Sequence, residues 1–198
     1  MKKIIYIITG LNVGGAEIVL LRLLMKINKK EYDPLVITLR EKGIIGERIE
    51  KLGINVYCLR IHSFINLLPG LIKLVNKINI FNPQIIHTFM IHSAFFVGII
   101  AKLLNKPTII WNIFCTDLSL QSNKYKTRLI IKMCAYLSKI IPNRIIVDSN
   151  ASYASHKKAG YSWEKMEIIH NGVDTNEFSP NTIKRSEYRK QYFKENIK

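Results

Sequence analysis

The stretch "KIIYIITGLNVGGAEIVLLRLLMKI", residues 3–27, changes its hydrophobic period once, and that change decides the fold class. Its first part is a continuous, β-branched apolar run, which is typical of a strand covered on both faces. After a glycine-rich turn, apolar residues recur at steps of three and four, which predicts one face of a helix. The residues of that face are Ala16, Val19, Leu20, Leu23, Leu24 and Ile27.

The same alternation continues along the chain. Further strands are predicted over residues 34–39, 54–59, 83–89, 107–113, 143–149 and 166–170. Helices are predicted over residues 71–78, 91–104, 124–141 and 151–160, with Pro69 and Gly70 marking the start or a kink of the first. This order predicts βαβ units and a doubly wound parallel sheet, a Rossmann-like α/β domain over residues 1–170.

Right-handed crossovers place the loops that follow such strands on one rim of the sheet, where ligands bind. The rim is predicted to carry residues 10–15, 87–92, 112–117 and 148–150.

Composition limits the classes of protein. With 198 residues and 48% hydrophobic content, the chain can bury one good core. Cys58, Cys115 and Cys134 are odd in number and lack metal-ligand spacing, so neither a disulfide framework nor a zinc site is predicted, and a reducing cytoplasm fits best. No apolar run is long enough for a membrane-spanning helix.

The formal charge of +16 admits phosphate-rich substrates, an anionic membrane face or nucleic acid as partners. It is equally explained by a composition rich in lysine, and no nucleic-acid-binding signature is present.

The turn "TGLNVGGAE", residues 9–17, places Gly10, Gly14 and Gly15 at spacings unlike those of dinucleotide-binding or P-loop motifs. Glycines still allow a ligand to approach the backbone, and the helix that follows offers free N–H groups to an anion. A tight turn chosen only for packing explains the same residues, and spacing alone leaves both interpretations open.

Three motifs occur in one order: "GGAE" at 14–17, "IIHTFMIHSAFFVGIIAKLLNKPTIIWNI" at 85–113 and "HNGVDTNEFSP" at 170–180. Together they resemble the N-terminal half of a family 4 glycosyltransferase of GT-B fold. The resemblance is particularly close to members that build bacterial lipopolysaccharide, capsule and other surface glycans. It implies transfer of a sugar from a nucleotide-sugar, with retention of anomeric configuration and without a metal or other cofactor.

The resemblance also implies site residues. Gly14 and Gly15 would face the cleft near the acceptor and the donor pyrophosphate, while His87 and His92 would line the acceptor side. In the loop after the fifth strand, Asn112 and Asp117 are the polar candidates for substrate binding.

Many relatives have a histidine in that loop that contacts the transferred sugar, and the matching position here is Cys115. A thiol cannot replace the two nitrogens of an imidazole, so no catalytic residue is assigned.

The pattern around each histidine gives a separate prediction. His87 ends an apolar strand and is predicted to be a buried, hydrogen-bonded core residue, whereas His92 opens a helix beside the rim and favours function. His62 and His156 are predicted to lie at the surface, and His170 is predicted to help seat the segment after the last strand.

Residues 171–198 are predicted to be a hinge and a basic tail that lead to a second, donor-binding domain missing from this chain. Asn171, Gly172 and Asp174 would shape the hinge turn, with Phe178 packed beneath it. Glu187 and Glu195 have the spacing of the family's donor-site glutamate pair, but a basic tail is the wrong setting and the match is interpreted as accidental. The chain is therefore expected to be inactive alone, as a fragment or as one subunit of a split enzyme.

The helix predicted over 124–141 carries basic residues along one stripe, which are Lys124, Arg128, Lys132 and Lys139. Its opposite face is predicted to pack against the core through Leu129, Met133, Leu137 and Ile140. The basic stripe is either an ordinary solvated face or a patch that binds anionic lipid, which would place the protein peripherally on the inner face of the cell membrane.

Alternative functions stay open at this point. One is a non-catalytic module that binds a glycolipid or a nucleotide, and another is a sugar-nucleotide epimerase, although the "GGAE" loop favours the transferase. A metal-dependent transferase is disfavoured because the sequence holds no Asp-x-Asp pair.

Overall fold

The computed structural model describes residues 1–63, 65–104, 108–114, 125–175 and 178–192. Its centre is a seven-stranded sheet in the order β3-β2-β1-β4-β5-β6-β7, and every neighbouring pair is parallel. The strands are β1 (Lys2–Ile8), β2 (Tyr32–Thr38), β3 (Val56–Cys58), β4 (Ile85–Phe89), β5 (Thr108–Ile113), β6 (Arg144–Val147) and β7 (Met166–Ile168). The predicted doubly wound parallel sheet is confirmed.

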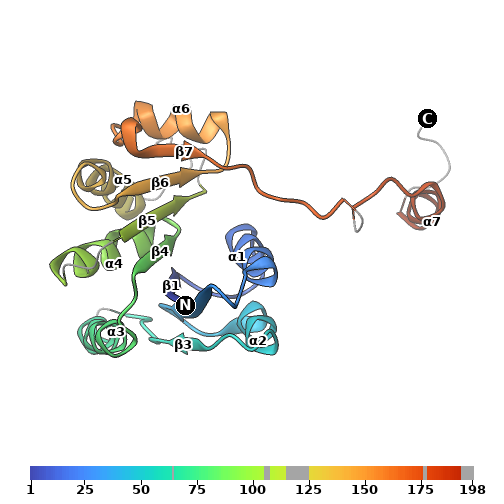
Figure 1. Ribbon diagram of the computed structural model, residues 1–198. Coiled ribbons are helices and arrows are strands. Elements are labelled where there is room, and N and C mark those ends of the chain that lie inside the picture. The colour runs from blue at the N-terminus through green and yellow to red at the C-terminus, as the bar shows by residue number, and fades with distance from the viewer. Residues whose placement is uncertain (64, 105–107, 115–124, 176–177, 193–198) are drawn as a thin grey trace.

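Helices cover both faces of this sheet (Figure 1). Helices α1 (Gly15–Lys26) and α2 (Gly43–Lys51) lie on one face, and α3 (Leu67–Phe81), α4 (Ile91–Leu103) and α5 (Tyr125–Ser138) lie on the other. The smaller α6 (Asn150–Lys158) and the 3-10 turn η1 (Trp163–Lys165) connect β6 to β7, and α7 (Thr182–Tyr192) follows the last strand.

Strand alternation divides the apolar residues between two cores. On β1, Ile5 and Ile7 enter the core beneath α3, α4 and α5, while Ile4, Tyr6 and Ile8 enter the core beneath α1 and α2. Each fully buried isoleucine contributes about 1.5–3 kcal/mol to the stability of the fold. Because successive residues of a strand point to opposite faces, one continuous apolar run supplies both cores.

Helix α2 was not predicted from the sequence. It contains Gly43 and Gly46, which weaken a helical pattern, and it forms because Ile45 and Ile49 are buried against the α1-side core. Helix α3 begins at Leu67, two residues before Pro69, and α6 ends before Gly160, whose φ of 91° only glycine adopts easily.

The predicted core face of α5 is wrong for three of its four residues, because only Leu137 packs against the core. The buried side chains there are Ile131, Cys134, Ala135 and Ser138, while Leu129, Met133 and Ile140 are exposed. Helix α5 lies close to α4, where the Cys134 Sγ is 3.8 Å from the carbonyl oxygen of Ile91, and the small side chains of Cys134 and Ala135 are buried at this side of the helix.

The segment after β7 leaves the sheet along α1 (Figure 1). The Nδ1 of His170 lies 2.9 Å from the carbonyl oxygen of Asp148, which confirms that His170 seats this segment. Phe178 is exposed rather than packed beneath the turn, and the guanidinium of Arg22 lies over its ring. Helix α7 projects away from the domain and has no buried residue.

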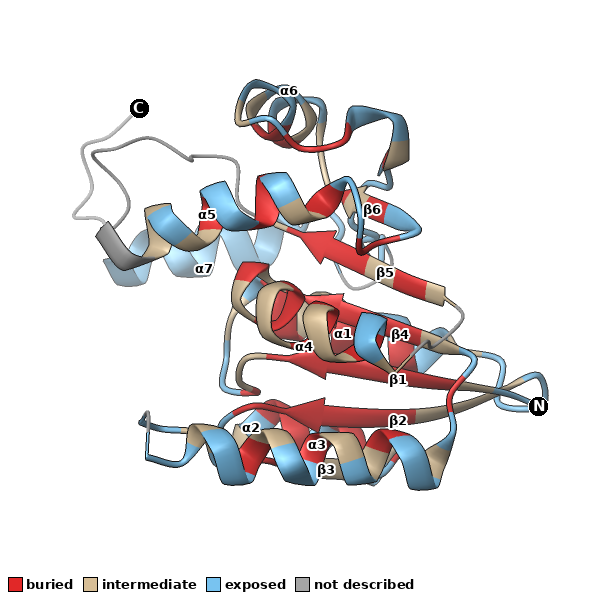
Figure 2. Ribbon diagram, turned by 90° about the vertical axis from the view of Figure 1, so that its left-hand side faces the viewer, coloured by how far each residue is buried: buried red, intermediate tan, exposed pale blue. Residues whose placement is uncertain are grey.

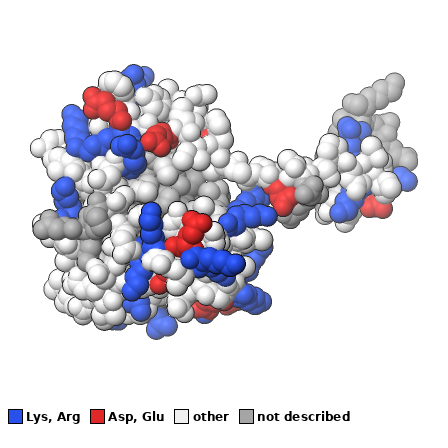
Figure 3. All heavy atoms as spheres, in the orientation of Figure 1, with Lys and Arg blue, Asp and Glu red and all other residues white. Residues whose placement is uncertain are grey.

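None of the described helices is both long and apolar enough to cross a membrane. Seen along the strands from their amino ends, lysine and arginine side chains are spread around the surface rather than gathered in one patch (Figure 3).

Candidate functional site

The candidate site lies where the sheet changes its direction of winding. Strands β1 and β4 are neighbours, yet α1 and α4 that follow them cover opposite faces, so their loops separate at this point. Such switch points at the carboxyl ends of parallel strands are where open α/β sheets bind ligands. All strands are parallel, and in Figure 2 the arrowheads of β1, β2 and β5 point to the same edge of the sheet, which we call the rim.

Two helices present their N-termini at the rim. Helix α1 begins after Gly14 and α4 begins after Met90, and neither has a side chain that caps its first N–H groups. Free N–H groups at a helix N-terminus attract anions and hydrogen-bond acceptors.

The two glycines of the first loop differ in their surroundings. A Cβ atom on Gly14 would overlap the carboxylate of Glu17, which is buried against the start of α1. A Cβ atom on Gly15 would meet no described atom within 4 Å, and Gly15 is exposed. Packing therefore accounts for Gly14, whereas the space over Gly15 is open to a ligand.

Across the rim, Met90 has a φ of 74°, a conformation that costs energy for a residue with a side chain. It directs the chain from β4 into α4, whose second residue is His92. Burial and the positive charge of Arg40 lower the pKa of His92, so the imidazole is neutral at physiological pH and has Arg40 for a neighbour.

Arg40 was missed by the sequence reasoning. It follows β2, its backbone N–H donates to the carbonyl oxygen of Thr9 over 3.1 Å, and its side chain is exposed beside the rim. A cation placed directly after a buried strand was the signal that could have identified it.

His87 lies below the rim rather than on it. It occupies the middle of β4, and its ring packs between those of Tyr6, at 5.5 Å, and Phe89, at 4.7 Å. Burial lowers the pKa of His87 to about 3, and its Nε2 has no hydrogen-bond partner among the described residues. The predicted burial is confirmed, but the expected hydrogen bonding at Nε2 is not found.

Asn112 lies in β5 opposite Phe89 and is buried near the carboxyl end of the strand. Its Oδ1, like the Oγ1 of Thr9, has no partner among the described residues. Buried polar atoms are normally paired, so these two mark positions where a water molecule or a ligand group would be accommodated.

The remaining predicted residues lie elsewhere. Cys115 and Asp117 fall outside the described residues. Asn171, Gly172 and Asp174 lie beyond β7 and are exposed, and Gly172 contacts α1.

His156 was predicted at the surface and is fully buried instead. It lies on α6 with its Nδ1 2.8 Å from the carbonyl oxygen of Ser152, and Tyr161 packs edge-on against its ring.

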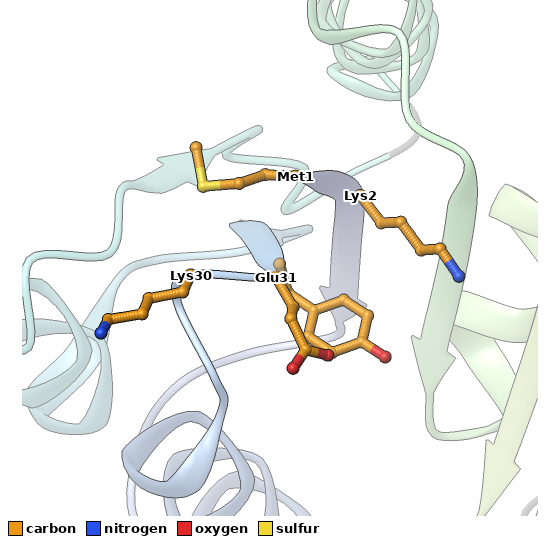
Figure 4. Close-up of a pocket in the computed structure, with 5 residues that line it drawn as sticks. Met1, Lys2, Lys30 and Glu31 are labelled. Atoms are coloured by element: carbon orange, nitrogen blue, oxygen red, sulfur yellow. The ribbon is translucent and has the colours of Figure 1, made fainter.

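Two hollows of the described surface lie outside the space over Gly15. One, of about 330 Å³, is at the amino ends of β1 and β2, where Lys2 and Lys30 point away from each other (Figure 4). A second, of about 490 Å³, lies beside β3 and includes Glu41, Lys42 and Arg60. Among the described residues, no three metal-ligating side chains come together.

The same fold is found in solved structures of other proteins. The structure of Anabaena HepE in complex with UDP and glucose superposes with a TM-score of 0.77 at 22% identity, over 96% of this chain and 50% of that one. The lipopolysaccharide outer core galactosyltransferase WaaB gives 0.61 at 15% identity, over 87% of this chain and 46% of that one. The UDP-GlcNAc 2-epimerase from Neisseria meningitidis gives 0.59 at 11% identity, over 85% and 46%. The chain therefore has the Rossmann-like fold of one half of these GT-B structures.

The fold is common to transferases and the epimerase, but the amino-acid sequence of this chain matches a transferase family. Residues 13–177 match the Glycosyltransferase Family 4 domain, and the chain belongs to that family, of which it is an N-terminal domain. No curated protein matches the sequence. The chain spans about half the length of the solved structures that it resembles.

Proposed function

We propose that the rim is the acceptor-side wall of a crevice in which a sugar passes from a nucleotide-sugar to a surface-glycan acceptor. One observation carries the proposal: the uncapped N-termini of α1 and α4 flank the switch point, and the space over Gly15, the first residue of α1, is open. Gly15, His92 and Asn112 then contact substrates, Gly14 shapes the loop by its packing against Glu17, and His87 supports the wall from below.

The proposed donor is a UDP-sugar. Anabaena HepE, whose half superposes on this chain, is described with UDP and with UDP-glucose. The free N–H groups at the start of α1 would face the pyrophosphate, where negative charge develops as the sugar leaves. The rest of the nucleotide is assigned to a second domain, and the transfer is proposed to retain configuration without a metal.

The proposed acceptor carries an anionic group, such as the phosphate of a lipid-linked glycan. Arg40 supplies an exposed positive charge beside the rim, and the neutral imidazole of His92 can accept a proton or a hydrogen bond from an acceptor hydroxyl. Lipid-linked acceptors would place the protein on the cytoplasmic face of the cell membrane, as in lipopolysaccharide or capsule synthesis.

Residues 171–198 are proposed to lead to the donor wall, with Asn171, Gly172, Asp174 and Phe178 as the hinge. Closure of two domains about such a connector excludes water and assembles the site. In this proposal residues 1–170 alone hold an acceptor but transfer sugar very slowly.

The test is transfer of label from radioactive UDP-glucose to a bacterial lipid extract. It is run with the purified chain, and with the chain joined to a donor half or mixed with one. We expect slow or no transfer by the chain alone and clear transfer after a donor half is supplied. Rapid transfer by the chain alone, or none in either case with a panel of UDP-sugars, would refute the proposal.

A further inference from the structure

Helix α5 exposes a stripe of large apolar side chains. Leu129, Met133 and Tyr136 follow one another at steps of four and three residues, and Ile140 comes four residues later in the turn that ends the helix. Their exposed fractions are 51%, 42%, 66% and 53%. A large part of each apolar side chain is therefore in contact with water unless a partner covers it. Contiguous exposed apolar surface marks an interaction site.

The charged residues on the same face of the protein are almost all basic. Asp117 is the only acidic residue between Arg60 and Val147, whereas this stretch holds eight lysines and three arginines, counting Arg60. Helices α3, α4 and α5, which cover this face of the sheet, contain no acidic residue. The helices of the opposite face contain Glu17, Glu47 and Glu50.

The three helices lie side by side across one face of the sheet (Figure 2). Besides α5, the start of α3 exposes Ile65, Leu68 and Ile72, again at steps of three and four. Exposed lysines accompany both stripes, Lys73 on α3 and Lys132 and Lys139 on and after α5. We call this surface, made of α3, α4 and α5, the basic–apolar face.

We propose that the basic–apolar face binds peripherally to an anionic lipid bilayer. Apolar side chains flanked by lysines suit the boundary between headgroups and acyl chains, where the lysine stems extend and their ammonium groups meet lipid phosphates. Tyr136 fits the same depth, since its ring is apolar and its hydroxyl is polar. A second copy of this chain bound through the same face would bring like charges together, because the helices of this face have no acidic residue to offset the lysines.

This inference concerns a surface outside the rim and is tested without a sugar donor. Binding of the full chain is measured by flotation with vesicles of phosphatidylcholine alone, and with vesicles of phosphatidylcholine and phosphatidylglycerol in equal parts. We expect binding to the anionic vesicles only, and weaker binding in high salt. No binding to either, or equal binding to both, overturns the proposal.

Two matched pairs of variants locate the bound surface. Leu129→Gln with Met133→Gln should lower the partition coefficient at least about tenfold, since both side chains would otherwise enter the membrane boundary. Leu23→Gln with Met25→Gln is the control, because these residues of α1 are similarly exposed, at 40% and 56%.

In the second pair, Lys132→Glu with Lys139→Glu should lower binding by about fivefold per lysine or more. Lys26→Glu with Lys51→Glu changes the net charge equally on the other face and should have a much smaller effect. Equal losses for test and control variants would show a general charge effect and overturn the assignment. A concentration-dependent dimer in size-exclusion chromatography that Leu129→Gln with Met133→Gln abolishes would assign the face to a second copy and also overturn it.

Discussion

The guanidinium of Arg22 lies over the ring of Phe178, 5.4 Å from its centroid, and the same side chain donates from Nη1 to the carbonyl oxygen of Gly172 over 3.2 Å. Arg22 is on α1, whose N-terminus forms the glycine loop of the rim. One helix therefore contacts both the proposed substrate wall and the connector that leads to the proposed donor wall.

Replacing Arg22 by alanine should release the connector from α1. A cation–π contact of this kind and a charged hydrogen bond each contribute about 0.5–2 kcal/mol, so local opening of residues 171–178 should become several-fold more frequent. Hydrogen exchange of the Phe178 amide, which donates to the carbonyl oxygen of Asp174, measures this opening.

Arg48→Ala is the matched control for Arg22→Ala, because Arg48 is an exposed arginine on α2 and lies outside the connector. Equal exchange rates in the two variants and the wild type would show that the Arg22 contacts do not hold the connector.

The two glycines of the loop should respond differently to alanine. Gly15→Ala has room for its methyl group and a helical position to occupy, so stability should be unchanged or higher by up to about 1 kcal/mol. If a ligand uses that space, sugar transfer should nevertheless fall. Thermal unfolding and the transfer assay together check this, and full activity of Gly15→Ala would contradict a role in ligand approach.

Gly14→Ala should instead act within the protein. Its methyl group must displace the Glu17 carboxylate, so stability should fall, and Glu17→Ala combined with Gly14→Ala should restore part of the loss. Independent, additive effects of the two substitutions would argue against this contact.

His87 should make the protein sensitive to acid. Its pKa is lowered to about 3 in the folded state, whereas an unfolded histidine titrates near pH 6.5. As the pH falls from about 6.5 toward 3, the unfolded chain binds a proton that the folded chain does not, so the free energy of unfolding falls by up to about 1.4 kcal/mol per pH unit.

His87→Leu removes that proton-binding difference and the unpaired Nε2. Urea unfolding should show a shallower loss of stability below pH 6.5 and equal or greater stability at neutral pH. His62→Leu, at an exposed site, is the control and should follow the wild type. A variant at position 87 with the wild-type pH dependence would contradict the account.

The sequence predicted the sheet well because its central strands are short, largely buried and rich in β-branched residues, as Ile4, Ile5, Ile7 and Ile8 of β1 show. It failed where tertiary contacts override local pattern. Helix α2 contains two glycines and depends on the burial of Ile45 and Ile49. His156 follows an ordinary polar pattern and is buried only because Tyr161 folds over it.

The error at α5 has a different cause. Helical period shows which residues share a face but not which face is covered, and large apolar residues were assigned to the core by default. Close contact with α4 selects Cys134 and Ala135 for the core and leaves Leu129 and Met133 outside. In the same way, Arg40 reaches the rim only because β2 lies beside β1 in the sheet.

The central claim is that the edge between β1 and β4 is where substrates meet this protein. Its most direct test is kcat/KM for sugar transfer by the chain with a donor half, comparing Arg40→Ala and His92→Ala with Lys30→Ala at the opposite, amino-terminal edge. We predict a loss of at least about tenfold for each of the first two, as expected when a charged or hydrogen-bonded substrate contact is removed, and wild-type activity for the third. Unchanged activity in both Arg40→Ala and His92→Ala would contradict the account.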